Sequence, residues 1–447
     1  MAVNGAGPKG RPITGNLLEF RKDPLAFLQK AYKEYGDFVP IRFGPTRHVY
    51  LISDPDSIKE VLLTKQASFR KAKGLQTAKA VIGEGVLTSE GEQHMRQRRM
   101  LQPAFKKTTI SRYGDTMVRY SEELISEWRS GEERVITNDM MRLTLNIITQ
   151  TMFGMNLSEG YGDVSHALEV GMKYVSRRAS SFIDLPFELP TKNNKEFKES
   201  AEMLDKIIYG IIQERRAKGE EDREDLLAML LAARDDEDGT GMTDKQVRDE
   251  VMTIFLAGHE TTANTLAWTF YLLSQNPDAR AKLEEELDRV LTDRLPTVAD
   301  LEKLPYTGNV IWEALRIYPP VWAVNREVSE EVEIGGHLLK PGDTVMMSQY
   351  VIHRSDRYFE DPEVFRPERF EGDLLKRIPG FAYFPFGGGP RICIGNHFAF
   401  MEASLVLATI ARRFRLDLAE DHHKVEGEPL VTLRPKHGLR MVAEKRR

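Results

Sequence analysis

The sequence predicts a mainly α-helical protein with a minor β portion, folded as a single large domain over residues 1–447. The chain has 447 residues, of which 41% are hydrophobic and 29% charged, so it can build a large core. A helical apolar pattern of about 30 residues, or ~45 Å, follows Thr243 and ends at Asn276. Because such a helix crosses the core of a large domain, one helical domain is favoured over two small ones.

The first half of the chain gives mixed signals. Residues 38–42 and 48–52 fit a short strand pair, and helical periodicity begins at Pro55. Residues 91–120 contain seven Lys or Arg against two acids, which predicts a basic helical patch. Residues 214–250 are acidic, which is typical of an exposed helix end and loop.

The second half has clearer helix boundaries. Thr243 and Gln246 fit a capping box at the start of the long helix. Further helices are expected over 278–291 and 306–317, because Pro319 and Pro320 stop the latter. Residues 321–350 suggest short antiparallel strands. The last helix is expected from near Gly395 to Phe414.

Composition excludes several functional classes. Lys and Arg total 63 against 68 Asp and Glu, a net charge of -5, so nucleic-acid binding is not expected. No stretch reaches the ~18 apolar residues of a membrane span, so we expect no transmembrane anchor and a soluble, cytoplasmic monomer. Cys393 is the single cysteine, which rules out an intrachain disulfide and a multi-cysteine metal site.

Cys393 follows a glycine-rich stretch and precedes an apolar helix. The amide groups and dipole at a helix N-terminus favour a thiolate. Gly387, Gly388, Gly389 and Gly395 would let the backbone approach a flat ligand. Ligation of iron by the thiolate is one use of such a loop, and an inert buried cysteine is the alternative.

Residues 386–395, FGGGPRICIG, match the pattern Phe-x-x-Gly-x-Arg-x-Cys-x-Gly. Three further motifs appear in order along the chain: AGHETT at 257–262, EALR at 313–316 and PERF at 367–370. This ordered set resembles the cytochrome P450 superfamily of haem-thiolate monooxygenases. The resemblance covers the chain from about residue 250 to its end, and is weaker in the first half.

The resemblance implies haem b between the long central helix and the cysteine loop with its following helix. Cys393 is then the thiolate ligand of the iron. Thr261 corresponds to the residue that offers its hydroxyl to iron-bound dioxygen. Glu260 corresponds to the acid that relays protons. Gly258 would open room for a ligand. The alternative for this segment is a packing kink, with threonine hydroxyls bonded to carbonyls one turn earlier.

Other residues are expected to hold the haem or the fold around it. His94 and Arg98 resemble the family's Trp-x-x-x-Arg pair, with His94 where a tryptophan is usual. Glu313 and Arg316 can pair on one helix face, and with Arg369 would form a structural network; a solvated surface pair is the alternative. The expected haem contacts are His94, Arg98, Arg326, Arg391, Phe386, Gly395 and Ala257.

The implied reaction inserts one atom of dioxygen into an apolar C–H bond, with electrons from NAD(P)H. About 50 residues follow the cysteine loop, too few for a fused reductase domain. A separate ferredoxin or flavodoxin with its reductase is therefore expected. Its docking face is expected near Arg96, Arg99, Lys106 and Lys107.

The substrate is expected to be a hydrophobic small molecule. The motifs resemble the branch with fatty-acid hydroxylases, and Arg70, Lys71 or Lys73 could hold a carboxylate; terpenoids and polyketides are alternatives. A peroxide-driven peroxygenase and a non-catalytic haem-based binding or sensor protein are the rival functions. The expected pocket residues are Ala257, Thr261, Val321, Trp322, Ala323 and Val324, with the 70–88 loop and the 176–190 region.

Overall fold

The computed structural model describes residues 6–155, 161–179, 189–219, 225–235, 239–372, 374–422 and 425–446. The chain forms two compact units. The first comprises residues 1–76 and 312–393, and the second comprises residues 77–311 and 394–447. The expectation of one domain over the whole chain stays a prediction.

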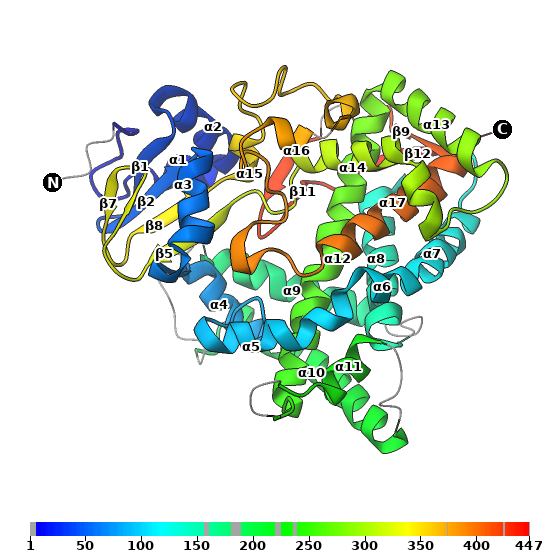
Figure 1. Cartoon of the computed structure of the whole chain (residues 1–447), viewed down its shortest axis with the longest axis horizontal. Helices are drawn as coiled ribbons and strands as arrows, with labels where there is room; N and C mark the ends of the chain where they lie inside the picture. The colour runs from blue at the N-terminus through cyan, green and yellow to red at the C-terminus, as the bar shows by residue number, and fades with distance from the viewer. Residues whose placement is uncertain are drawn as a thin grey trace. The chain divides into compact units, whose positions relative to one another are not determined.

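A five-stranded sheet organises the first unit, with the strand order β1-β2-β8-β5-β3. Figure 1 shows the N-terminal strands of this sheet beside strands from the last third of the chain. β2 and β8 pair in parallel, whereas the other neighbours are antiparallel. The strands are β1 (Phe38–Phe43), β2 (Arg47–Ile52), β8 (Thr344–Met347), β5 (Val324–Val328) and β3 (Phe69–Lys71).

Both faces of this sheet carry apolar side chains. Ile52, Val345 and Met347 belong to one buried cluster, and Leu51 and Met346 belong to another. This alternation is the two-residue period of β-strands. The remaining elements of the unit are α1 (Leu17–Lys22), α2 (Pro24–Tyr35), α3 (Pro55–Lys59), β6 (Val332–Ile334), β7 (His337–Leu339), α15 (Gln349–Ile352), α16 (Leu374–Arg377) and the end of α14 (Pro305–Ile317).

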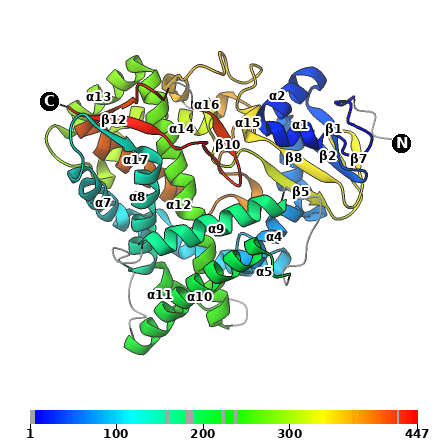
Figure 2. The ribbon, with the colours of Figure 1, turned by 180° about the vertical axis from the view of Figure 1, so that it is seen from behind.

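The second unit is built around α12 (Asp244–Gln275), which is 32 residues long. Its N-terminus is closed by the predicted capping box, in which Gln246 N donates to Thr243 Oγ1 at 3.2 Å and Thr243 N donates to Gln246 Oε1 at 2.9 Å. Most of its side chains are buried, as the long apolar pattern predicted. α12 packs against α8 (Ile136–Phe153), and the two helices lie side by side in Figure 1 and Figure 2.

Shorter helices and two small sheets complete this unit. β12 (Arg440–Lys445) pairs with β4 (Glu132–Val135) and with β9 (Phe414–Leu418), and β10 (Gly427–Pro429) pairs with β11 (Leu433–Pro435). The other helices are α5 (Gly91–Leu101), α6 (Lys107–Ile110), α7 (Gly114–Ser126), α9 (Tyr161–Ala179), α10 (Lys192–Lys218), α11 (Leu226–Ala232), α13 (Pro277–Leu291) and α17 (Asn396–Arg413), while α4 (Lys73–Ile82) begins in the first unit.

The mainly α class with a minor β portion is confirmed, and so are the expected helices after residue 276. The antiparallel strands expected within residues 321–350 are confirmed, because β5 pairs with β8 and β6 pairs with β7 in antiparallel fashion. β8 also pairs in parallel with β2, which lies outside this segment. One expectation was wrong in part: the acidic stretch 214–250 is more than an exposed helix end and loop, because it contains α11, whose leucines are buried. Its residues 220–224 and 236–238 lie outside the described part of the chain.

Candidate functional site

The predicted ligand Cys393 lies in a loop that its own backbone holds in place. Cys393 N donates to the carbonyl of Phe386 at 2.9 Å. Gly389 has φ of +66°, and a Cβ there would lie 1.9 Å from the carbonyl oxygen of Leu62, so this position requires glycine. The side chain of Cys393 is exposed. The loop therefore presents an accessible sulfur from a constrained backbone.

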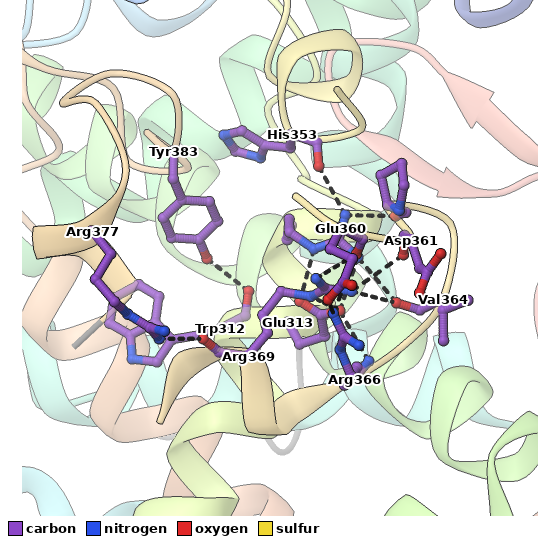
Figure 3. Close-up of polar contacts among 12 residues, drawn as sticks. Trp312, Glu313, His353, Glu360, Asp361, Val364, Arg366, Arg369, Arg377 and Tyr383 are labelled. Carbon is purple, nitrogen blue, oxygen red and sulfur yellow. Dashed lines mark hydrogen bonds and ion pairs between the residues drawn. The ribbon is translucent and has the colours of Figure 1, made fainter. Parts of the chain in front are cut away.

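The structure brings together Glu313, Arg316 and Arg369, the three residues expected to form a network (Figure 3). Arg316 Nε donates to Glu313 Oε2 at 2.7 Å, and Arg316 Nη2 donates to Oε1 at 2.8 Å. Arg369 Nε and the backbone N of Arg366 each donate to Oε1 at 3.0 Å. The side chains of Glu313 and Arg316 are 0% exposed, which excludes the solvated-pair alternative.

The same guanidinium groups bind backbone carbonyls of the segment that follows α15. Arg316 Nη1 donates to the carbonyls of His353 at 2.8 Å and Pro362 at 2.6 Å. Arg369 Nη1 donates to the carbonyl of Glu360 at 2.7 Å, and burial lowers the pKa of Arg369. The buried charges are therefore hydrogen-bonded throughout, as burial of a guanidinium demands.

Two buried polar residues next to the network were missed by sequence reasoning. The backbone N of Phe384 donates to His353 Nε2 at 3.0 Å, and the hydroxyl of Tyr383 donates to the carbonyl of Trp312 at 2.7 Å. Burial, aided by the charge of Arg316, lowers the pKa of His353 well below its usual value, and burial raises that of Tyr383. Both side chains are thus neutral anchors. Neither lies in a recognisable motif, so no sequence signal identified them.

The AGHETT segment lies in the middle of α12, where Ala257 is exposed although most of the helix is buried. Thr261 Oγ1 donates to the carbonyl of Ala257 at 2.8 Å, one turn earlier. Gly258 does not open room for a ligand as expected. A Cβ at Gly258 would lie 2.8 Å from Ile148 Cδ1, so this glycine lets α8 approach α12 closely. The i, i+4 face of Ala257 and Thr261 is the accessible part of the segment.

Glu260 points to a different face of α12 and is 7% exposed. Its Oε1 accepts a hydrogen bond from Thr432 Oγ1 at 2.5 Å. The neighbouring His259 is also buried, and its Nδ1 lies 2.9 Å from the carbonyl of Phe255. Desolvation lowers the pKa of His259, so it is a neutral core residue. Glu260 is therefore the acidic group of this segment, and a residue far away in the sequence holds it.

The residues expected to bind haem propionates divide between the two units. In the second unit, His94 and Arg98 lie one turn apart on α5; His94 is buried, with Nδ1 3.0 Å from the carbonyl of Val86, and Arg98 is half-buried. In the first unit, Arg326 lies on β5 and Arg391 lies two residues before Cys393; both are half-buried. The imidazole of His94 therefore contacts the backbone of Val86, in the same unit.

The predicted pocket residues Val321, Trp322, Ala323 and Val324 form a half-buried segment that leads into β5. Ser348 Oγ donates to the carbonyl of Trp322 at 2.8 Å and fixes this segment. Of the 176–190 region, residues 180–188 lie outside the described part of the chain.

Two of the three candidate carboxylate-binding residues, Arg70 and Lys71, have contacts within the chain. Arg70 forms an ion pair with Glu327 across the β3–β5 pair. Lys71 is 5% exposed, and its carbonyl accepts a hydrogen bond from Gln76. Lys73 is exposed, so the expectation that a residue of this segment could hold a carboxylate stays a prediction.

The basic patch around α5 and α6 is only partly available to a partner. Arg96 Nε lies 3.1 Å and Arg99 Nη2 lies 3.4 Å from Oδ2 of Asp235, a residue just 4% exposed. These two arginines therefore compensate a buried carboxylate, contrary to the expectation of an open docking face. Lys106 and Lys107 are exposed.

Comparison with known protein families matches residues 6–441 to the family described as Cytochrome P450. The chain belongs to the cytochrome P450 family. It is 37% identical to cyclooctatin synthase of Streptomyces melanosporofaciens over 92% of this chain and 89% of that protein. It is 36% identical to cyclooctat-9-en-7-ol 5-monooxygenase of the same organism, over 93% and 90%. It is 32% identical to pentalenene oxygenase of Streptomyces avermitilis, over 94% and 92%.

The protein is thus a cytochrome P450 monooxygenase, and membership implies haem with cysteine-thiolate ligation and the use of dioxygen. The donor set fits that group, because Cys393 is the chain's one cysteine and its side chain is exposed on a glycine-rich loop. In the first unit, half-buried Arg326 and Arg391 would supply charge for the propionates. Within the described ranges, no helix has the length and apolar character needed to cross a membrane.

Proposed function

We propose that this cytochrome P450 hydroxylates a neutral, apolar terpenoid-like substrate, with Cys393 as the thiolate ligand and with Glu260 and Thr261 handling protons. The observation that carries the proposal is the accessible sulfur of Cys393 on a loop that requires glycine at 389. Haem bound through a thiolate supplies the activation of dioxygen, so that one oxygen atom enters a C–H bond and the other leaves as water.

The chain's own groups would position the cofactor and supply the protons. The hydrogen bond from Cys393 N to Phe386 fixes the backbone that carries the sulfur. Arg98, Arg326 and Arg391 would pair with the propionates, while Glu313, Arg316 and Arg369 keep the segment before the cysteine loop in place. These last three have a structural role and no proton-transfer duty.

Protons would reach the site through two neighbouring residues of α12. Glu260 is a buried acid next in sequence to Thr261, whose hydroxyl now donates to the carbonyl of Ala257. To donate its hydrogen toward the cofactor, Thr261 Oγ1 would have to turn that hydrogen away from the carbonyl of Ala257. Glu260 would then supply the replacement proton.

The substrate class is proposed from the predicted pocket residues and from the names of relatives. Val321, Trp322, Ala323 and Val324 are apolar, and Arg70 is paired with Glu327. Two relatives are named for an unsaturated alcohol, cyclooctat-9-en-7-ol, and for pentalenene. We therefore favour a neutral unsaturated hydrocarbon or its alcohol over a free fatty acid.

Electrons would come from NAD(P)H through a separate ferredoxin or flavodoxin and its reductase. Because Asp235 engages Arg96 and Arg99, the proposed docking face narrows to the exposed Lys106 and Lys107. The Lys106→Glu, Lys107→Glu double variant should reduce the rate of haem reduction by an acidic ferredoxin, more strongly at low salt. An unchanged rate would reject this face.

The proposed function is tested by the carbon monoxide difference spectrum of the reduced protein. We expect the red-shifted Soret band of haem-thiolate ligation, and its loss in Cys393→Ala; a band that survives this change would overturn the assignment of the ligand. Titration of the ferric protein with neutral terpene alcohols should shift the spin state, and matched fatty acids should do so less. Turnover with hydrogen peroxide alone would support the peroxygenase, and electron consumption without product would support the sensor.

A further inference from the structure

Thr432, in the turn between β10 and β11, contacts the acid of α12. Figure 1 shows β11 beside this helix. Thr432 Oγ1 lies 2.5 Å from Glu260 Oε1, and Asn264 Nδ2 lies 3.1 Å from the same hydroxyl oxygen. Thr432 is 4% exposed, Glu260 7% and Asn264 1%. The three polar side chains therefore satisfy one another in a nearly dry environment.

The direction of these two hydrogen bonds follows from the groups involved. The Asn264 amide nitrogen can only donate, so the hydroxyl oxygen of Thr432 is its acceptor. A threonine hydroxyl has one hydrogen, and an ionised carboxylate can only accept. The hydrogen of Thr432 is therefore directed at Glu260 Oε1. This hydrogen bond fixes one of the two carboxylate oxygens of Glu260.

The turn itself is held by a separate hydrogen bond. Trp268 Nε1 donates to the carbonyl of Leu433 at 3.0 Å. Glu260, Asn264 and Trp268 are spaced by four residues and share one face of α12. Because the Trp268 bond does not involve the Thr432 side chain, loss of the Thr432 hydroxyl should leave the turn in place. The hydroxyl can thus be tested apart from the fold.

We propose that Thr432 is a positioning residue for Glu260, and that its hydroxyl holds the carboxylate in the orientation from which protons are delivered. The proposal rests on the proton-delivery role of Glu260 in the proposed function. Productive turnover consumes RH, O₂, two electrons and two protons and yields ROH and water. When the two protons are delivered in the wrong position, the same O₂, two electrons and two protons leave as hydrogen peroxide instead. A misdirected Glu260 should therefore raise the share of peroxide.

The test compares Thr432→Val, which removes the hydroxyl at nearly constant shape, with Thr432→Ser, which keeps it. In the holoenzyme, Thr432→Val should raise the ratio of hydrogen peroxide to product about tenfold, since a lost hydrogen bond to a charged group has about this effect. Thr432→Ser should stay near the native ratio. Thr269→Val is the matched control, because it removes a buried threonine hydroxyl that donates to the carbonyl of Thr265 on α12.

Two further measurements separate positioning from a structural effect. In Glu260→Gln, adding Thr432→Val should have no further effect on the ratio; an additive effect would overturn the proposal. Isotope-edited infrared spectra of the ferric protein should show the Glu260 carboxylate band shifted in Thr432→Val and retained in Thr432→Ser. If Glu260→Gln changes the ratio and Thr432→Val does not, only this proposal fails. If Glu260→Gln also leaves it unchanged, the acid of the proposed function fails with it.

Discussion

Two carboxyl groups, one in each unit, are buried equally deeply but have different hydrogen-bond partners. Glu313 of the first unit and Glu250 of the second are both 0% exposed. Glu313 accepts hydrogen bonds from two guanidinium groups and a backbone amide. Glu250 accepts one from Val86 N at 2.9 Å, and its Oε1 has no partner among the described residues. Burial depth alone therefore does not decide what a buried acid does.

The difference arises from where the nearby cations go. Lys245 Nζ and Arg248 Nη1 both bind Asp249, at 2.7 Å and 2.9 Å, so neither compensates the neighbouring Glu250. Desolvation raises the pKa of Glu250 to about 8, and the charge of Asp249 adds to this effect. Burial likewise raises the pKa of Glu402 on α17 well above its usual value. At pH 7 Glu250 is therefore protonated, whereas Glu313 belongs to a buried ion-pair network.

The largest loss of unfolding free energy is expected from Glu313→Gln. Removal of this charge leaves two buried guanidinium groups without their counter-ion, which typically costs about 3–5 kcal/mol. That loss is a large part of a typical unfolding free energy, so soluble yield should fall sharply. Urea unfolding of the purified holoenzyme measures the change.

Glu360→Gln is the matched control, because it neutralises a glutamate whose side chain is 80% exposed and paired with Arg366. We expect less than about 1 kcal/mol from that change. Similar unfolding free energies for the two variants would show that the buried network does not stabilise the first unit.

The sequence alone predicted the parts of this comparison that are local or belong to a motif. Glu313 and Arg316 are three residues apart on one helix, so their pairing follows from helical periodicity. The start of α12 followed from the capping box at Thr243. The third network member, Arg369, was identified through its motif, and the structure brings it to Glu313.

The contacts that the sequence did not predict join segments that meet only in the folded chain. The contact of Thr432 with Glu260 joins residues 172 positions apart, and no local pattern indicates it. Asp235 looked like part of an exposed acidic loop, yet Arg96 and Arg99 surround it. Gly258 looked like a ligand-binding position because its neighbours suggested a functional site, but Ile148 of α8 decides its role.

A smaller change in unfolding free energy is expected from Glu250→Gln. It should appear as a weaker dependence of that free energy on pH. In the unfolded chain Glu250 ionises near 4.5, whereas in the fold its pKa is about 8. Between these values the folded protein holds a proton that the unfolded chain has lost. Stability should therefore fall as pH rises, by up to about 1.4 kcal/mol per pH unit, and this contribution should level off above the folded pKa.

Urea unfolding between pH 5 and pH 8 measures this profile, and Glu250→Gln should be less steep because glutamine keeps an acceptor for Val86 N but does not titrate. Glu92→Gln, at an exposed position of α5, is the control and should reproduce the native slope. Glu402 also contributes to the native slope, so the difference between the two profiles is the quantity that reports on Glu250. Parallel profiles for Glu250→Gln and the native protein would mean that Glu250 is already ionised in the fold, and the contrast with Glu313 would disappear.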